Sequence, residues 1–137
     1  MTWLSTYSRK VRYSDTDAQA IVFNGNYAVY FDDALTDLFD DLDLGQAEMQ
    51  AHGFEVVTAN LNINFRATAT LKDVLETRVR LGRVGTKSLT FELETSIAGT
   101  DTITADGSCV WVTVDHETFK AIAVPQALLD KLQAPPT

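Results

Sequence analysis

The sequence predicts an α+β domain in which one long helix packs against an antiparallel sheet. Apolar residues recur every three or four positions between residues 27 and 42, and at every second position in several later segments. The first spacing is typical of an amphipathic helix and the second of half-buried strands. With 137 residues, of which 45% are hydrophobic and 22% charged, the chain has the size and composition of a single globular domain, 1–137.

The elements before residue 54 are a strand, a long helix and a short helix. Residues 6–13 mix aromatic and β-branched residues with polar ones, which favours a first strand. The long helix is expected over residues 27–42, and its apolar stripe is unusually aromatic. The members of this stripe are Tyr27, Tyr30, Phe31, Ala34, Leu35, Leu38, Phe39 and Leu42. A second helix is expected over residues 46–52, ended by Gly53 as a left-handed cap.

Four strands are expected in the second half of the chain. Residues 59–65, 75–81 and 89–93 alternate apolar and polar side chains, and a longer apolar strand covers 103–114. Gly99 marks a turn before the last strand. Pro125 opens a short terminal helix to Leu132, and residues from about 134 form a flexible tail. One sheet packed around one helix satisfies both periodicities.

Charge and cysteine content bound the function. The net charge of −8, from 19 acidic and 11 basic residues, argues against a nucleic-acid partner or an anionic membrane surface, which require clustered Lys and Arg. A single cysteine forms no internal disulfide, and the N-terminus has no apolar segment of signal-peptide length. No run approaches the roughly 18 apolar residues of a membrane span. We therefore expect a cytoplasmic protein without a membrane segment.

The most informative segment reads YSDTDAQAIVFNGNYAVYF, from Tyr13 to Phe31. Asp15 and Asp17 precede the start of the long helix, where unpaired backbone N–H groups and the positive end of the helix dipole face outward. A polarised carbonyl or an anion would be held there. The segment therefore combines carboxylates with an oxyanion-type site.

This segment resembles the signature of hotdog-fold acyl-CoA thioesterases, in the branch similar to 4-hydroxybenzoyl-CoA thioesterase. The family pattern runs approximately aromatic-x-D-x-D-x-x-G-[IV]-V-aromatic-x-x-N-Y. The matching residues are Tyr13, Asp15, Asp17, Ile21, Val22, Phe23, Asn26 and Tyr27. Ala20 stands where the family usually has glycine, so either the local backbone differs or the acyl pocket is tighter.

The resemblance implies a hotdog fold, with a long central helix wrapped by an antiparallel sheet of about five strands. It also implies a homodimer or a dimer of dimers (a homotetramer), with sites at the subunit interface. The implied reaction is hydrolysis of an acyl-CoA to a free acid and CoA, with no cofactor and no metal.

The resemblance assigns the catalytic carboxylate to Asp17, as general base toward water or as nucleophile through a mixed anhydride. Asp15 is expected to order the loop. Backbone N–H groups around Phe23, Asn24 and Gly25 would polarise the thioester carbonyl, and Asn24 is the favoured position. For Asn26, capping or loop bonding is the better interpretation.

Six further residues are candidates for binding the substrate. Ala20 and Tyr27 belong to the motif, although core packing is the leading alternative for Tyr27. Thr58 and Asn60 fall where relatives line the pocket from the partner subunit, or else form the solvent face of a strand. Arg66 and Lys87 are candidates for the nucleotide phosphates of CoA, with surface solubility as the alternative.

Other chemistries find less support. No G-x-S-x-G motif is present, and His52 and His116 lack metal-ligand spacing. Cys109 lies on an apolar strand, which favours a packed core thiol. Three alternatives remain: a thioesterase acting on acyl carrier protein, disfavoured by the negative charge; a non-catalytic acyl-CoA-binding module; and, ranked last, a hotdog hydratase. The sequence does not define the acyl group.

Overall fold

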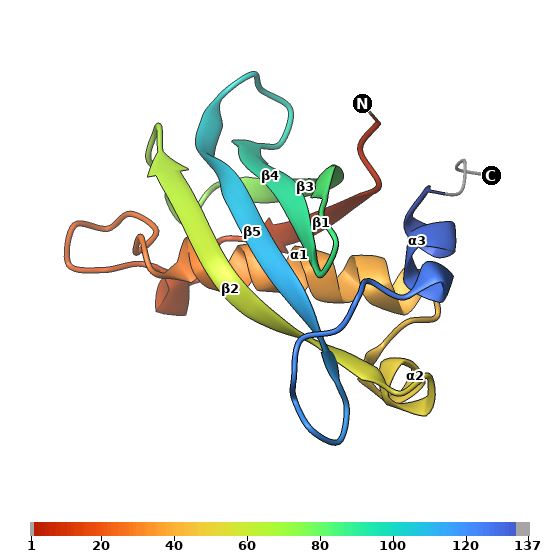
Figure 1. The fold of residues 1–137 in the computed structure, drawn as a ribbon. Helices are drawn as coiled ribbons and strands as arrows, with labels where there is room; N and C mark the ends of the chain where they lie inside the picture. The colour runs from red at the N-terminus through yellow and green to blue at the C-terminus, as the bar shows by residue number, and fades with distance from the viewer. Residues whose placement is uncertain (1, 134–137) are drawn as a thin grey trace.

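The computed structural model describes residues 2–133 and contains one antiparallel sheet wrapped around one long helix (Figure 1). Its elements in chain order are β1 (Ser5–Lys10), the 3-10 turn η1 (Tyr13–Asp15), α1 (Asn26–Asp41), α2 (Gln46–Ala51), β2 (Phe54–Phe65), β3 (Val74–Val84), β4 (Ser88–Ile97), β5 (Ile103–Asp115) and α3 (Gln126–Gln133). The predicted α+β class is confirmed. The tail expected from residue 134 lies outside the described residues. Within residues 2–133, no helix combines the length and apolar character needed to cross a membrane.

The order of strands in the sheet is β1-β3-β4-β5-β2, and all pairs are antiparallel. β3, β4 and β5 follow one another through hairpins and form the centre. β2 precedes β3 in the chain but does not pair with it. It lies at the edge of the sheet opposite β1, where it pairs with β5 (Figure 1). The sheet therefore has two unequal edges, the 6-residue β1 and the 12-residue β2.

The core lies between α1 and the inner face of the central strands. Seven of the eight residues of the predicted stripe are buried, and Leu42 is partly buried. The rings of Phe39, Phe91 and Trp111 pack with centroids 4.9 to 5.9 Å apart. Because each large apolar side chain contributes roughly 1.5–3 kcal/mol on burial, this cluster fixes the position of α1 on the sheet.

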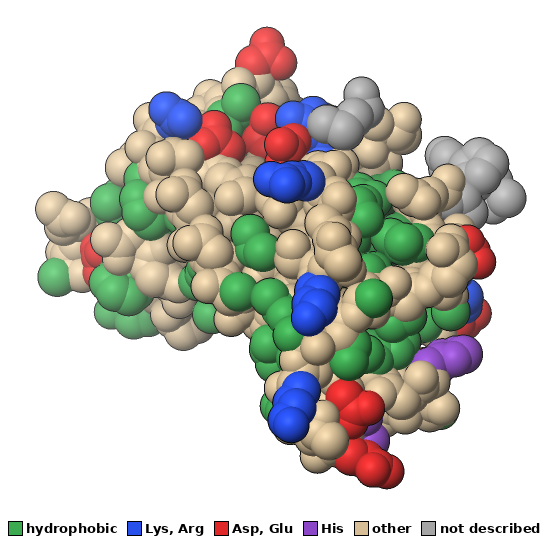
Figure 2. Space-filling view, viewed as in Figure 1, with side chains coloured by type: hydrophobic (Ala, Val, Ile, Leu, Met, Phe, Trp, Pro, Cys, Tyr) green, Lys and Arg blue, Asp and Glu red, His purple; other side chains and the backbone are tan. Residues whose placement is uncertain are grey.

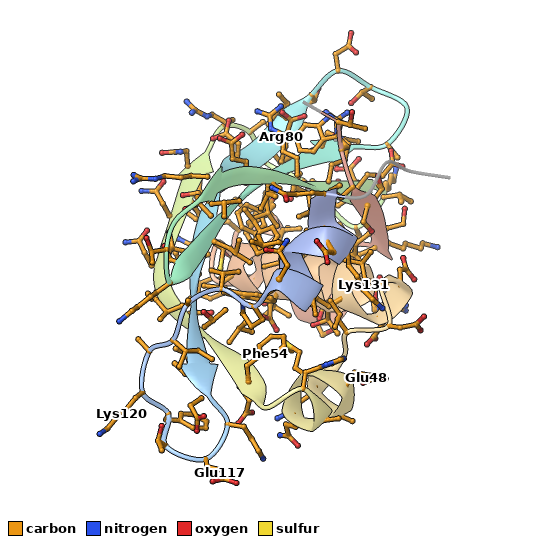
Figure 3. All side chains as sticks on the ribbon, turned by 45° about the vertical axis from the view of Figure 1, so that its right-hand side comes forward. Glu48, Phe54, Arg80, Glu117, Lys120 and Lys131 are labelled. Carbon is orange, nitrogen blue, oxygen red and sulfur yellow. The ribbon has the colours of Figure 1, made fainter. Side chains whose placement is uncertain are left out.

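Two local features connect the short helices α2 and α3 to the rest of the fold. Gly53 follows α2 with a φ of 86°, as its predicted role in a left-handed cap requires, and Phe54 is buried directly after it. Lys131 of α3 donates from Nζ to the carbonyl oxygen of Leu42 at 2.7 Å, at the end of α1. Figure 3 labels Phe54, at the start of β2 beside α2, and Lys131 on α3.

β1 and β2 are two of the strands whose boundaries differ from the prediction. β1 ends at Lys10, because the chain turns where the carboxylate of Asp15 accepts the N–H of Arg12. β2 begins at Phe54, five residues before the expected start, and it is not half-buried: Leu61 is 42% and Phe65 54% exposed. The reason is its place at the edge, where a neighbouring strand covers only one side.

Candidate functional site

The motif forms a closed loop between η1 and α1. Thr16 and Val22 form an isolated antiparallel bridge, and the N–H of Phe23 donates to the carbonyl oxygen of Asp15 at 2.9 Å. The two arms of the loop therefore run side by side, with the residues between them projecting from the fold. In Figure 1 this loop lies at the left, beside the start of α1.

Asp15 is the residue that closes this loop. The residue is 5% exposed, and its two carboxylate oxygens accept hydrogen bonds from Arg9 Nη2 (2.8 Å), Arg9 Nε (3.1 Å) and the N–H of Arg12 (2.8 Å). Burial by itself raises the pKa of this carboxyl, but the hydrogen bonds from Arg9 and Arg12 outweigh it, so the net shift is downward. The carbonyl oxygen of Asp15 also accepts from Asn26 Nδ2 at 2.7 Å. The expectation that Asp15 orders the loop and that Asn26 bonds within it is confirmed.

Asp17 lies near the tip of the loop and is partly exposed. Its Oδ1 accepts the N–H of Gln19 at 2.8 Å, and its own N–H donates to the carbonyl oxygen of Ile21 at 3.0 Å. Within residues 2–133, its second carboxylate oxygen has no hydrogen-bond partner. The carboxylate is therefore anchored through one oxygen and free at the other, as a general base or a nucleophile must be.

Ala20 has the backbone conformation that glycine adopts in tight turns. Its φ is 63°, and its N–H donates to the carbonyl oxygen of Asp17 at 2.9 Å. The left-handed conformation costs a residue with a Cβ about 1–2 kcal/mol. Ala20 therefore adopts the positive φ that a glycine would reach without this cost.

The start of α1 offers two free backbone donors. The N–H of Phe23 is used by Asp15, which corrects the prediction that it would belong to the oxyanion group. The N–H groups of Asn24 and Gly25, in contrast, have no hydrogen-bond partner in the part of the chain that the structure describes. They precede a helix of 16 residues, whose dipole places partial positive charge at this end. Asn24 itself is exposed.

Tyr27 lies in the core beneath this loop. Its side chain is 3% exposed, and its ring packs edge-on against Tyr30 and Phe65, with centroids 5.6 and 5.8 Å away. Burial raises the pKa of Tyr27. Burial, followed by the nearby charge of Asp15, raises the pKa of Tyr30 to about 12, so the hydroxyls of both tyrosines keep their protons at neutral pH. The structure places Tyr27 in the packed core, the alternative that the sequence left open.

Thr58 and Asn60 do not share a face of the sheet. A register shift between them pairs Thr58 with Trp111 and Asn60 with Val110, which are consecutive residues of β5. Because consecutive residues of a strand point to opposite faces, the bulge turns Thr58 inward and Asn60 outward. Thr58 borders a hollow of about 230 Å³, whose other lining residues are Asp32, Gln46, Met49, Glu55, Val56 and Trp111.

Arg66 and Lys87 lie at opposite ends of the sheet. The N–H of Arg66 donates to the carbonyl oxygen of Thr104, whereas the carbonyl oxygen of Lys87 accepts from the N–H of Thr113. Nine residues of β5 separate these two points, which corresponds to about 30 Å. Arg66 also forms two hydrogen bonds of 3.2 Å with Asp106.

The Asp17 loop belongs to the Arg66 end of the sheet. The N–H of Val22 donates at 2.9 Å to the carbonyl oxygen of Ala69, three residues after Arg66. Within one chain, Lys87 is therefore remote from the loop. The sequence also gave no reason to single out Arg9, the side chain bonded to Asp15; its only signal was a basic residue on the strand preceding the motif.

The known proteins that resemble this chain include acyl-CoA thioesterases. The model of the thioesterase-like superfamily matches residues 11–132. Long-chain acyl-CoA thioesterase FadM of Escherichia coli is 31% identical over 124 residues, which cover 90% of this chain and 93% of the relative. Acyl-CoA thioester hydrolase YbgC of E. coli O6:H1 is 24% identical over 128 residues, covering 93% and 95%.

A solved structure extends the comparison to the fold. The 1,4-dihydroxy-2-naphthoyl-CoA thioesterase Slr0204 from Synechocystis superimposes with a TM-score of 0.85, covering 93% of this chain and 94% of the other, at 19% sequence identity. At this identity the likeness concerns the fold alone. The hotdog fold implied by the motif is confirmed.

Proposed function

Because the chain belongs to the thioesterase-like superfamily, we propose that it is an acyl-CoA thioesterase that releases a free acid and CoA. One observation carries the proposal. Among the described residues, the carboxylate of Asp17 keeps one oxygen free of hydrogen bonds, and the far arm of its loop ends in two amides without a partner at a helix start. The names of the similar proteins FadM and YbgC support the choice of acyl-CoA as substrate.

The two amides provide the oxyanion site. The thioester carbonyl oxygen would accept hydrogen bonds from the N–H groups of Asn24 and Gly25 and gain from the dipole of α1. Negative charge grows on this oxygen as the carbon becomes tetrahedral, so the donors stabilise the transition state more than the substrate. A single donor of this kind contributes about 10²–10³ in kcat.

Asp17 activates the nucleophile. As general base it takes a proton from water while the hydroxide adds to the carbonyl carbon; the tetrahedral intermediate then expels CoA thiolate, which receives the proton. As nucleophile it attacks the carbon itself, expels CoA thiolate and forms a mixed anhydride that water hydrolyses. Both routes use the free oxygen of the carboxylate.

The loop keeps the two parts of the site within reach of one substrate. The N–H of Asp17 donates to the carbonyl oxygen of Ile21, and Asn24 is the third residue after Ile21, which is a span of at most about 11 Å. A carboxylate, a water molecule and a thioester carbonyl fit within that span. The proposed site thus requires no rearrangement of α1.

We also propose that the active form is a dimer joined through β2. Among residues 2–133, no strand pairs with the edge of β2 that faces away from β5, and Val57, Leu61 and Phe65 are exposed along β2. An exposed apolar edge strand of 12 residues favours pairing with a second copy. Figure 2 shows hydrophobic side chains gathered on the left of the molecule, over the loop and the end of β2.

The test is thiol release from a panel of short, long and aromatic acyl-CoAs, followed with a thiol-reactive dye. We expect turnover of at least one class, and Asp17→Asn should lower kcat at least 100-fold while CoA binding persists. Asp41→Asn, on the exposed face of α1, is the matched control and should retain wild-type kcat. Wild-type rates in Asp17→Asn would contradict the mechanism.

The same panel, extended with acylated acyl carrier protein, separates the alternatives. CoA binding without hydrolysis of any acyl-CoA would favour a non-catalytic module, and turnover only on acyl carrier protein would identify a carrier-protein thioesterase. Single turnover in ¹⁸O-labelled water distinguishes the two routes, because only hydrolysis of an anhydride places label in the carboxylate of Asp17 when water attacks its carbonyl.

A further inference from the structure

We propose that Arg9 is a positioning residue for this reaction: through Asp15 it holds the Asp17 arm of the loop in register with the free amides of Asn24 and Gly25. The inference rests on the proposed function for its kinetic consequence. Its structural part, the ordering of the loop, can be tested whether or not the protein turns over acyl-CoA.

Four segments meet at Asp15. Its carboxylate accepts from Arg9 on β1 and from the N–H of Arg12 in the turn, while its carbonyl oxygen accepts from Phe23 at the end of the loop and from Asn26 at the start of α1. Within residues 2–133, the only side chain that donates to the carboxylate is that of Arg9. Arg9 therefore supplies two of the three hydrogen bonds that orient the carboxylate of Asp15.

Arg9 is itself held in place. It pairs with Leu75, a buried residue of β3, so its side chain leaves β1 toward the core. Its guanidinium lies 5.5 Å from the ring centroid of Tyr30, which is within range of a cation–π contact. Its two hydrogen bonds to Asp15 use both carboxylate oxygens in a fork that a single ammonium cannot reproduce.

The consequence for catalysis follows from geometry. Asp17 is two residues after Asp15 on one arm, and Asn24 immediately follows Phe23, which bonds to Asp15 on the other. Loss of the Arg9 hydrogen bonds frees Asp15, and the two arms then move relative to each other. A misplacement of about 1 Å can cost on the order of 100-fold in rate, while groups that hold CoA elsewhere are unaffected.

Arg9→Gln removes the charge and the fork, and Lys10→Gln is the matched control. Lys10 is the next residue on β1, carries the same charge and lies exposed on the opposite face. We expect Arg9→Gln to lower kcat 10- to 100-fold with KM changed less than threefold, and Arg9→Lys to restore part of kcat. Lys10→Gln should stay within twofold of the wild type.

Amide hydrogen exchange provides a readout independent of activity. In Arg9→Gln the amides of residues 16–23, including that of Phe23, should exchange at least tenfold faster, while the β4 amides change less than twofold. If the variant fails to fold, the same two measurements on Arg9→Lys decide the question, with smaller changes of the same pattern expected.

The outcomes are distinct. If the wild type hydrolyses no thioester but the exchange pattern is as expected, the proposed function fails and the ordering role of Arg9 stands. Unchanged kcat in a folded Arg9→Gln protein, or a fall in kcat with no change in loop exchange, overturns the positioning role. A fall in thermal stability alone, with kcat and exchange near wild type, also overturns it.

Discussion

The centre of the sheet and its edge strand β2, here called the rim, differ in how far a single chain buries their side chains. On β4, Leu89, Phe91 and Leu93 are at most 2% exposed, and on the other face Glu92 and Glu94 pair with arginines of β3. On β2 the residues from Val57 to Asn62 are all exposed. The centre meets its packing and polar requirements within one chain, whereas the rim leaves apolar area and backbone groups open.

The difference separates the residues that stabilise the fold from those to which we assign assembly and catalysis. The Asp17 loop lies at one end of this rim, since Phe65 packs on Tyr27 and Val22 bonds to Ala69. Substitutions in the centre should therefore change the free energy of unfolding. Substitutions at the rim and in the loop should change assembly and catalysis with smaller effects on folding.

The largest effect on stability is expected at the centre. Phe91→Ala removes a fully buried ring that packs against Phe39 and Trp111 at 5.9 and 5.4 Å. We expect the free energy of unfolding to fall by about 3–5 kcal/mol, from lost transfer energy and the cavity left behind. Urea denaturation measures it, and Thr90→Ala, on the other face of β4, should cost less than about 1 kcal/mol. Similar losses in both variants would contradict the importance of the inner face.

A smaller effect on stability is expected at Asp15, the residue that closes the loop. Asp15→Asn removes the charge paired with Arg9 and should cost about 2–3 kcal/mol at pH 7. Because the folded pKa of Asp15 lies below its ordinary value of 3.8, this contribution is present above that value. It is lost as the pH falls through the lowered pKa, where the folded carboxylate protonates.

The measurement for Asp15 is urea denaturation of the wild type and Asp15→Asn between pH 7 and pH 2. The two curves of unfolding free energy against pH should run parallel above about pH 5 and converge below about pH 4. A difference that is constant down to pH 2 would show that the charge of Asp15 does not stabilise the fold.

The sequence predicted the centre better than the rim, for physical reasons. Periodicity identifies which residues of 27–42 and 75–81 face a core, because burial there is decided within one chain. It does not reveal that β2 pairs with β5, since pairing across the sheet is not encoded in local alternation. A bulge at residues 58–60, which separates Thr58 from Asn60, leaves no distinct pattern either.

The candidate site was predictable to the same extent. The motif pointed to Asp17 and the helix start as candidates, and the hydrogen bonds of Asp15 agree with the loop-ordering role expected for it. It could not reveal that the N–H of Phe23 donates to the carbonyl oxygen of Asp15, because this hydrogen bond depends on how the loop closes. For the same reason it missed Arg9, six residues before its partner.

A gain in stability is expected within the loop. Ala20→Gly relieves the cost of a positive φ of 63°, offset in part by the greater freedom of glycine in the unfolded chain. We expect a net gain of about 0.5–1 kcal/mol in thermal or urea denaturation. Ala18→Gly, in the same loop, is not among the residues with positive φ and should instead lose about 0.4–1 kcal/mol. A loss in both variants would mean that the conformation of Ala20 is not strained.

The smallest effect on the folding of one chain, but a clear effect on assembly, is expected at the rim. Leu61 is 42% exposed on β2, so a lysine there adds little strain to the monomer. In a dimer joined through β2, Leu61→Lys would remove two apolar contacts of roughly 1.5 kcal/mol each, which corresponds to about 100-fold weaker association. Light scattering after size-exclusion chromatography, across a dilution series, measures this change. Ser8→Lys places the same charge on the other edge strand, β1, and should leave the dimer intact. If Leu61→Lys and Ser8→Lys dimerise equally well, β2 is not the interface, and its exposed apolar residues need another partner.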